Sequence, residues 1–474
     1  MSLRHLDAMA LAVIGLVLFA PGPASAGVQP GSPSDEEIRQ MLVTRVAVQK
    51  QATGIVVGII GPQGRRLVAF GTMAAGDQRP VGGDTVFDVG SLTKVFTALL
   101  LADMAHRGEV VLEAPVSTYL PANGVKVPKR GGRQITLVDL ATHTSGLPPR
   151  PTNLVSNEPE NKYAGYTVDL MYQCLSSLPG TGDRETRYEY SNLGYGLLGH
   201  ALARRAERSY AELLRARITE PLGLADTRID LTPGMRTRLA AGYDSDLVPA
   251  PHWDFGALES AGALRSTAND LLSFLEAVLG YHKTDLAPAM GLMLATRRPG
   301  GMQPSTQIAL AWNVLSSGGG LIAWKNGSVG GYRSFLGYDP SARVGVVALA
   351  NAQTAVGVDD IGLHVLDPSQ PVNLRPPKAH HEVPIDSAVL DRYVGRYRFS
   401  ATDVLTVTRD GNRLYGQEPG QDKFEMFAEG ERDFFLKVID AQVTFELQGD
   451  GPAAAALWHQ DGQDQRGVRI KSRK

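Results

Sequence analysis

The sequence has little of what would indicate cross-links or a strongly charged surface. Among 474 residues there is one cysteine, Cys174, which cannot form a disulfide within the chain. We expect it to be a small core residue on a helix around residues 168–177. Lysine and arginine number 47 and aspartate and glutamate 49, which gives a net charge of −2. This balance argues against nucleic acid or an anionic membrane as the main partner.

Long apolar runs are also missing. Residues 8–20 form an apolar run of 13 residues, which is too short for a membrane-spanning helix of about 20 residues. A weakly basic start at Arg4 precedes this run, and the small residues "ASA" at 24–26 follow it, as in a signal peptide with its cleavage site. We therefore predict that residues 1–26 are a signal peptide and that the mature chain is periplasmic or secreted. No cysteine stands at the cleavage point, so a lipoprotein anchor is not indicated.

The order of the predicted elements indicates one large α+β domain over residues 27–366. "TGIVVGII", a "GPQG" turn and "RRLVAFG" predict a β-hairpin. From Ser91 to about residue 290 the apolar spacing is mostly helical, and Ser34–Glu37 and Thr267–Asp270 match the capping box that begins a helix. Strand patterns return after residue 307. We therefore predict an antiparallel sheet built from both ends of the domain, flanked by helices and interrupted by a large helical insertion.

The remaining residues indicate a linker and a second domain. Residues 367–384 contain five prolines and little periodicity, which is typical of a linker. Residues 385–474 alternate apolar and polar positions between Asp-Gly turns, so we predict a small all-β domain. This segment has no cluster of nucleophile, base and acid, and we expect no chemistry in it. His380 and His381 in the linker are a poor metal pair without further ligands, and we expect them to be solvated.

The stretch "VFDVGSLTKVFT" at 86–97 contains the first candidates for chemistry. Ser91 and Lys94 lie three residues apart, so at the start of a helix they share a face and can come within hydrogen-bond reach. The N-terminus of that helix would offer N–H groups to a developing oxyanion. Lys94 can act as a base only if its pKa falls well below its free value of about 10.4, which burial and a neighbouring cation can cause. Taken alone, the stretch is better explained by a serine cap followed by a solvated lysine.

Two later stretches favour the catalytic interpretation. Tyr190 and Asn192 lie two residues apart, so both side chains can face one cleft. A tyrosine can relay a proton, and an asparagine can hold a substrate amide with its donor and its acceptor. Lys325 ends an apolar strand and is followed by Asn326 and Gly327. A cation at a strand end, beside a glycine that permits close approach, suits a substrate carboxylate.

Taken together, S-x-x-K, Y-x-N and K-x-G in this order resemble the serine β-lactamase and penicillin-binding protein superfamily. Specifically, they resemble the branch of class C β-lactamases, low-molecular-weight D-alanyl-D-alanine peptidases and related esterases. "FDVGSLTK" is similar to the class C active-site pattern, with Asp88 where glutamate is usual. "THTSG", which includes His143, resembles a stretch typical of this branch. "KNG" stands where Lys-Thr-Gly is usual, with Asn326 in place of threonine. The resemblance covers roughly residues 35 to 365.

The resemblance implies a serine acyl hydrolase. Ser91 would attack a carbonyl carbon and form an acyl-enzyme, and Lys94 and Tyr190 would share the proton transfers, with the choice of base left open. The N–H groups of Ser91 and Ser328 would hold the oxyanion. Lys325 would lower the pKa of Tyr190 and attract a substrate carboxylate. No metal and no organic cofactor is needed.

Two further residues receive roles from the same resemblance. Asn192 would hold the amide of the acyl side chain. Together with Lys325, Asn326, Gly327 and Ser328 it makes up the predicted substrate-binding set. His143 is given a structural role, since nothing in the sequence places it next to Ser91.

The substrate remains open at this stage. The same machinery serves D-alanyl-D-alanine cell-wall peptides, β-lactams and, in a carboxylesterase, simple esters. Asn326 removes a threonine hydroxyl near the substrate carboxylate, which weakens the case for an efficient β-lactamase. The predicted signal peptide favours a cell-wall or β-lactam substrate. An alternative of another class is a sensor or scaffold that binds β-lactam or peptide without turnover. The oligomeric state is not indicated.

Overall fold

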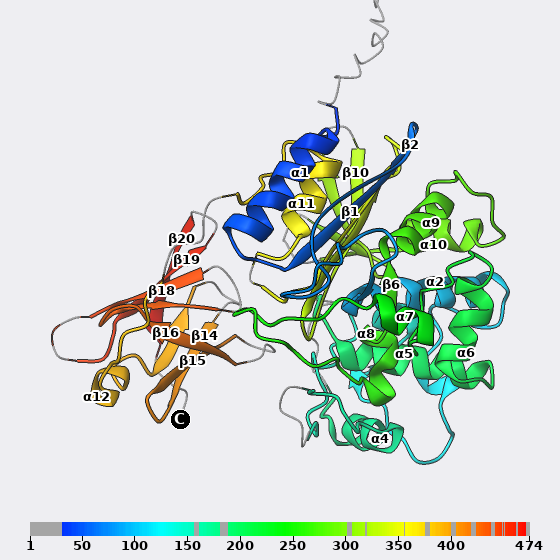
Figure 1. Cartoon of the computed structure of the whole chain (residues 1–474). Coiled ribbons are helices and arrows are strands. Elements are labelled where there is room, and N and C mark those ends of the chain that lie inside the picture. Colours follow the sequence, from blue (N-terminus) through cyan, green and yellow to red (C-terminus); the bar gives the residue numbers. More distant parts are fainter. Residues whose placement is uncertain are drawn as a thin grey trace, which may run out of the picture.

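The computed structural model divides the chain into a large domain and a smaller β domain (Figure 1). It describes residues 31–155, 161–180, 188–300, 306–317, 320–354, 356–374, 380–399, 404–418, 423–437, 441–447, 449, 451–460 and 463–470. The predicted signal peptide at 1–26 lies outside these residues. Across the described ranges, no helix combines the length and the apolar character needed to cross a membrane.

An eight-stranded sheet forms the centre of the large domain. Its strand order is β2-β1-β12-β11-β10-β9-β8-β7, and all neighbours are antiparallel. The strands are β1 (Gly54–Gly61), β2 (Gly64–Gly71), β7 (Arg297–Pro299), β8 (Gln307–Ala309), β9 (Asn313–Ser317), β10 (Gly320–Val329), β11 (Tyr332–Asp339) and β12 (Val344–Ala350). Ile55 of β1 lies opposite Ala350 of β12. The two ends of the domain therefore share one sheet, as the sequence predicts.

Helices cover both faces of this sheet (Figure 1). On one face, α1 (Asp35–Val43), its continuation η1 (Thr44–Val48) and α11 (Asp359–Leu366) cover a core that includes Trp324 and Phe335. On the other face, α9 (Ala268–Val278) packs on β1 and β12. Because successive side chains of a strand point to opposite faces, β10 presents even-numbered residues to α11 and odd-numbered residues to the helical insertion.

The helical insertion lies between β2 and β7. It holds β3 (Val86–Asp88), η2 (Gly90–Leu92), α2 (Thr93–His106), η3 (Val116–Tyr119), β4 (Lys129–Arg130), β5 (Arg133–Gln134), α3 (Leu137–Ala141), α4 (Val168–Ser177), α5 (Asn192–Arg205), α6 (Tyr210–Leu214), η4 (Arg215–Thr219), α7 (Pro233–Arg238), η5 (Gly256–Leu258), α8 (Glu259–Gly262), β6 (Arg265–Thr267), α9 and α10 (Ala287–Ala295). Helix α2 is buried along nearly its whole length, from Thr93 to Met104. Its N-terminus is therefore held by packing on all sides.

Two capping boxes were predicted, and one of them is wrong in part. Ser34 and Glu37 form the reciprocal pair at the start of α1. At α9, Thr267 accepts a hydrogen bond from the Asp270 N–H at 3.1 Å. The Asp270 carboxylate does not return to the cap, because it accepts from the Asp226 N–H at 2.8 Å and the Thr227 hydroxyl at 2.9 Å. This carboxylate ties α9 to a neighbouring loop.

The β domain is a closed barrel of antiparallel strands in chain order from β13 to β20. They are β13 (Gly395–Arg398), β14 (Val404–Asp410), β15 (Arg413–Gln417), β16 (Phe424–Ala428), β17 (Asp433–Phe435), β18 (Ala441–Glu446), β19 (Ala455–Gln460) and β20 (Gln463–Ile470). One short helix, α12 (Ser387–Leu390), departs from the predicted all-strand pattern, because Asp386 caps its first turn and Leu390 is buried against the barrel. The predicted fold class, α+β with a C-terminal β domain, is confirmed.

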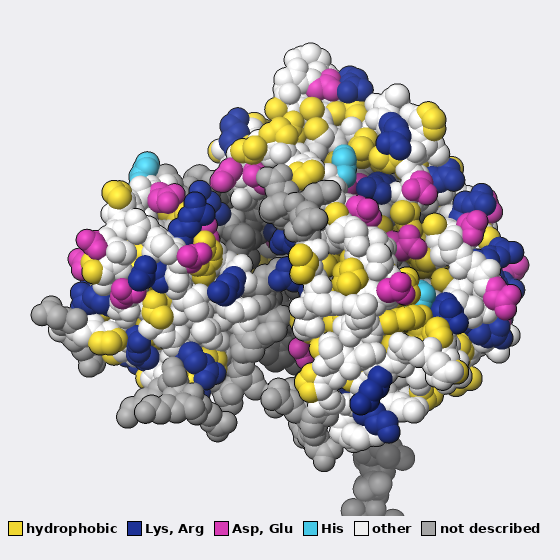
Figure 2. Space-filling model, turned by 90° about the horizontal axis from the view of Figure 1, so that it is seen from below, with side chains coloured by type: hydrophobic (Ala, Val, Ile, Leu, Met, Phe, Trp, Pro, Cys, Tyr) yellow, Lys and Arg dark blue, Asp and Glu magenta, His cyan; other side chains and the backbone are white. Residues whose placement is uncertain are grey.

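The surface charges do not separate by sign. On the face shown in Figure 2, basic and acidic side chains are interspersed over both domains. This agrees with the net charge of −2. The face therefore offers no extended basic field of the kind that binds nucleic acid.

Candidate active site

The three sequence motifs meet where the N-terminus of α2 lies against β10. Gly90 has a φ of +52°, in the left-handed region that favours glycine. A Cβ atom at Gly90 would lie 3.1–3.2 Å from the backbone of Ser328. A Cβ atom at Gly327 would collide with the Val89 carbonyl oxygen and lie 3.1 Å from the Ser91 nitrogen. Both glycines therefore permit a close approach that brings the Ser91 and Ser328 backbones together.

The edge of β10 beside Ser91 is open. Strand β9 pairs with β10 only as far as Trp324. In the described part of the chain, no strand pairs with residues 325–329 on that side. An extended peptide could use the free backbone groups there, as in strand addition to a sheet edge.

The Lys94 side chain is fully buried and surrounded by three oxygen atoms. Its Nζ lies 2.8 Å from Asn192 Oδ1, 2.6 Å from the Ala261 carbonyl oxygen and 3.1 Å from Ser91 Oγ. Burial, and then the nearby charge of Lys325, hold the pKa of Lys94 well below its usual value. Lys94 therefore has the environment that the sequence argument required of a base.

These contacts fit a neutral lysine. A neutral amine has two N–H groups and one lone pair, which matches two acceptor oxygens and one hydroxyl donor. In the structure Nζ donates to Asn192 Oδ1, to the Ala261 carbonyl oxygen and to Ser91 Oγ. When the amine is neutral, its two N–H groups keep the first two bonds and the Ser91 hydroxyl can donate to the Nζ lone pair. Lys94 is thus set to receive the serine proton.

Tyr190 is the second group at the serine. Its hydroxyl lies 2.5 Å from Ser91 Oγ. Burial raises the pKa of Tyr190 far above its usual value, and the hydrogen bond with Ser91 lowers it only in part. The expectation that Lys325 gives Tyr190 a lowered pKa is therefore wrong for the free site, because burial outweighs the neighbouring charge. Tyr190 is protonated and donates to Ser91 Oγ.

Lys325 also lies close to the tyrosine. Its Nζ is 4.8 Å from the centroid of the Tyr190 ring, and Lys94 Nζ is 4.7 Å from the same centroid. The side chain of Lys325 is 1% exposed. Burial lowers the pKa of Lys325 to about 8, and the charge of Asp359 opposes that shift. Lys325 therefore supplies the positive charge of the site, and burial together with that charge favours the neutral form of Lys94.

Three of the predicted substrate-binding side chains are already engaged. Asn192 accepts from Lys94 through Oδ1 and donates through Nδ2 to the Tyr163 hydroxyl at 3.0 Å. Asn326 points to the α11 face and donates to Asp359 Oδ2 at 2.5 Å. The Ser328 hydroxyl accepts from Gln353 at 3.0 Å, so its predicted contribution to an oxyanion site rests on its backbone N–H alone.

His143 lies at the site, which the sequence alone did not reveal. Its ring centroid is 4.5 Å from that of Tyr190, and its Nδ1 accepts the Ser191 N–H at 3.1 Å. Burial, and then Lys325 and Lys94, hold the pKa of His143 well below its usual value. The imidazole is therefore neutral, with its proton on Nε2. It is a positioning residue that supports the ring of Tyr190 and the backbone after it. Among the sequence motifs, only the "THTSG" stretch pointed to His143.

We expect the H143A variant to lower kcat/KM by about 10–100-fold, because even a small displacement of Tyr190 costs reactivity. In H143N the amide oxygen can replace Nδ1 as the acceptor of the Ser191 N–H. Asparagine also tolerates the backbone φ of +56° at this position. H143N should therefore recover most of the acylation rate. Equal rates in the two variants at equal Tm would refute this positioning role.

The carboxylate of Asp88 is held by two partners. It accepts from Arg265 Nε at 2.9 Å and lies 2.9 Å from His252 Nδ1. Asp88 is 3% exposed, and the pairing compensates its charge. It therefore braces the segment before Ser91 and is not placed to exchange protons with the serine. Among the described residues, no group of three or more potential metal ligands is present.

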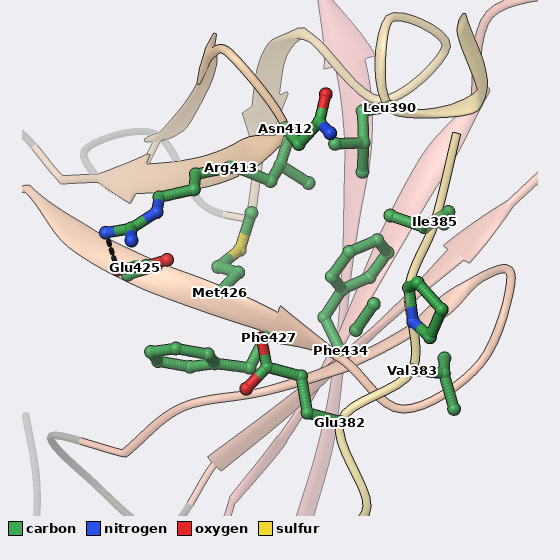
Figure 3. A pocket seen from close by; sticks show the side chains of 13 residues that line it. Glu382, Val383, Ile385, Leu390, Asn412, Arg413, Glu425, Met426, Phe427 and Phe434 are labelled. Atoms are coloured by element: carbon green, nitrogen blue, oxygen red, sulfur yellow. Dashed lines mark hydrogen bonds and ion pairs between the residues drawn. The ribbon is translucent and has the colours of Figure 1, made fainter. Parts of the chain in front are cut away.

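A separate cavity of about 440 Å³ lies in the barrel domain (Figure 3). Its walls come from the segment at 382–385, α12, and strands β15 to β17. The only charged side chains among its walls are Glu382, Arg413 and Glu425, and Arg413 pairs with Glu425 at 3.5 Å. None of its walls carries a serine, cysteine, lysine or histidine. This cavity therefore has neither the serine nor the lysine that define the site at Ser91.

Comparison with known proteins gives matches over both domains. A family model described as Beta-lactamase matches residues 37–367, and one described as Domain of unknown function (DUF3471) matches residues 379–469. Penicillin-binding protein 4* of Bacillus subtilis (strain 168) is 26% identical over 454 residues, which cover 91% of this chain and 98% of that protein. The D-alanyl-D-alanine-carboxypeptidase/endopeptidase AmpH of Escherichia coli (strain K12) is 28% identical over 309 residues, with coverage of 62% and 78%. The crystal structure of a class C beta lactamase from Rhodobacter sphaeroides superposes with a TM-score of 0.58 at 26% identity, covering 67% of this chain and 93% of that one.

Proposed function

Since the chain belongs to the Beta-lactamase family and is a serine hydrolase, we propose that it acts outside the cytoplasm on β-lactams or D-alanyl-D-alanine-type cell-wall peptides. The reaction passes through an acyl-enzyme on Ser91. One observation carries this proposal: Lys94 Nζ and the Tyr190 hydroxyl both lie within hydrogen-bond distance of Ser91 Oγ. The predicted signal peptide supports the location.

In acylation, neutral Lys94 accepts the proton of Ser91 as Oγ forms a bond to the substrate carbonyl carbon. The developing oxyanion takes hydrogen bonds from the N–H groups of Ser91 and Ser328, each worth about 10²–10³ in rate. Tyr190 then gives its proton to the leaving nitrogen as the C–N bond breaks, and protonated Lys94 restores the tyrosine. General acid–base help of this kind contributes about 10²–10⁴ in rate. Lys94 is thus the base in acylation and Tyr190 the acid.

In deacylation, water attacks the ester carbonyl carbon and Ser91 leaves. The same two groups remove the proton of the water and return one to Ser91 Oγ. Lys325 keeps a positive charge beside Tyr190 throughout, so it stabilises any transient negative charge on the phenol oxygen. The buried walls around Lys94 keep these transfers out of bulk water.

The test is an intact-mass measurement with benzylpenicillin, followed by peptide mapping. We expect a mass increase of one whole β-lactam molecule on the peptide that contains Ser91, because ring opening releases no leaving group. Initial rates on a chromogenic cephalosporin, a D-Ala–D-Ala peptide and a nitrophenyl ester then rank the substrates. An absent adduct together with no hydrolysis of any of the three would overturn the proposal. A lasting adduct without turnover would show a binding protein.

A further inference from the structure

The acidic residue behind Lys325 and Asn326 has no part in the proton transfers described above. Asp359 is the first residue of α11, and its Oδ2 accepts from Asn326 Nδ2 at 2.5 Å. Asn326 is itself the residue after Lys325 on the open edge of β10. The family resemblance places a threonine hydroxyl near the substrate carboxylate at this position, and Asn326 was predicted to be part of the substrate-binding set. The structure gives the amide N–H to a carboxylate of the protein itself.

The charges around Asp359 come from three elements. Lys325 of β10 and Arg333 of β11 each attract its negative charge, and Asp360, the next residue of α11, repels it. Asp360 is paired with the buried Arg45 of η1, so its charge is compensated. Arg333 donates through Nε to the Thr354 carbonyl oxygen at 3.0 Å. Asp359 therefore neutralises part of the positive field that a bound substrate would meet beside Asn326.

We propose that Asp359, acting through Asn326, makes this side of the cleft select against acyl donors whose leaving group carries a carboxylate. Preferred donors have one of two leaving groups. The leaving group is either the neutral alcohol of an ester, or an amine that carries an amide or an ammonium group in place of the carboxylate. Asp359 is thus a specificity-determining residue. This inference rests on the proposed function and ranks the substrates within it. Internal or blocked acyl donors come first, ahead of free C-terminal residues and of β-lactams such as benzylpenicillin, which carry a carboxylate on the leaving side.

The chemistry follows from what each leaving group would meet at this edge. A carboxylate beside Asn326 would face a second carboxylate across one shared amide, and like charges at this range repel. Asp359 also weakens the attraction of Lys325 for the substrate carboxylate. A neutral amide can donate to the free Oδ1 of Asn326 or to Asp359, and an ammonium group would gain the attraction that a carboxylate loses. The charge of Asp359 therefore reverses the preference at this subsite.

The test uses one acyl-D-alanyl-D-alanine peptide in two forms, with a free C-terminal carboxylate and with a C-terminal amide. At pH 7 we expect the wild-type protein to favour the amide form by about tenfold or more in kcat/KM, the scale of one repulsive charge contact. In D359N the amide oxygen still accepts from Asn326 but carries no charge, so the preference should fall by about tenfold. D464N removes an exposed carboxylate of the barrel and should leave the ratio unchanged.

A pH series supplies a second readout that a purely structural role would not move. Burial raises the pKa of Asp359 to about 6, so lowering the pH from 7 to 5 protonates it. Lys325 and Arg333 stay charged, burial holds the pKa of His143 well below its usual value, and Asp360 remains paired with Arg45. The carboxylate-to-amide ratio of the wild type should therefore rise as the pH falls, and that of D359N should not.

The outcomes separate this inference from the function on which it rests. If neither peptide nor benzylpenicillin acylates Ser91, the proposed function fails. If both peptides react and D359N leaves the ratio and its pH dependence at the wild-type values, the specificity role of Asp359 is refuted. A wild-type preference for the free carboxylate would refute it as well.

Discussion

The S91A variant should lose acylation and show a kcat/KM about 10⁴-fold or more below that of the wild type, as expected when a covalent nucleophile is removed. Tyr190, whose hydroxyl lies 2.5 Å from Ser91 Oγ, is not expected to replace it, since burial keeps the phenol protonated and a neutral phenol is a weak nucleophile. The measurement is the rate of penicilloyl adduct formation by mass spectrometry, together with hydrolysis of the preferred substrate.

Folding should be unaffected by this change, which makes the comparison clean. Ser91 is only half-buried, and Gly90, which the close packing on Ser328 requires, is retained. S273A, on the surface of α9, gives a matched loss of one hydroxyl outside the site and should keep full activity. Residual acylation of S91A at a tenth of the wild-type rate would remove Ser91 from its role and leave Tyr190 as the group to test.

Features that depend on neighbours in sequence could be predicted well. The hairpin of β1 and β2 follows from two apolar runs around a Gly-Pro-Gln-Gly turn. Helix α4 begins and ends within a residue of its prediction, because Thr167 caps it. Ser91 and Lys94 meet because residues three apart share a face at the start of a helix. In each case the signal and the contact lie in the same short segment.

Features that depend on contacts between distant segments could not be predicted. His143 supports Tyr190 by accepting a hydrogen bond from the N–H of Ser191, 48 positions away. Its left-handed backbone conformation cannot be recognised from the residue type. Asn326 meets Asp359 across 33 residues, since the start of α11 happens to cover that face of β10. The direction of the Tyr190 pKa was also missed, because motif spacing carries no information on burial. Local sequence motifs therefore predict which residues react, whereas the packing around those residues determines their pKa values.

Lys94 shows how packing and protonation act together. A buried lysine with a depressed pKa is a cost to folding, because the unfolded chain binds a proton that the folded chain does not. The packing of α2, α5 and α8 around Nζ offsets that cost and keeps the amine neutral. The burial of Lys94 thus lowers the stability of the folded protein and at the same time provides the base.

We therefore expect K94M to separate activity from stability. Methionine fills a similar volume but has no lone pair to receive the serine proton, so the rate of acylation should fall by about 10³-fold, within the range for a lost general base. K94R should be equally inactive, because an arginine stays protonated, and it should be less stable, since it buries a cation beside Lys325. Acylation is measured as adduct formation under single-turnover conditions.

The stability of K94M should depend on pH in a defined direction. In the wild type the folded pKa of Lys94 lies below its unfolded value of 10.5, so stability rises with pH across the window between the two values. K94M lacks this contribution, whereas Lys325, with a pKa lowered to about 8, acts alike in both proteins. The Tm of K94M relative to the wild type should therefore be most favourable at pH 7 and decline towards pH 10. A difference that stays constant over this range would mean that Lys94 is charged in the folded protein, and Tyr190 would then have to be the base.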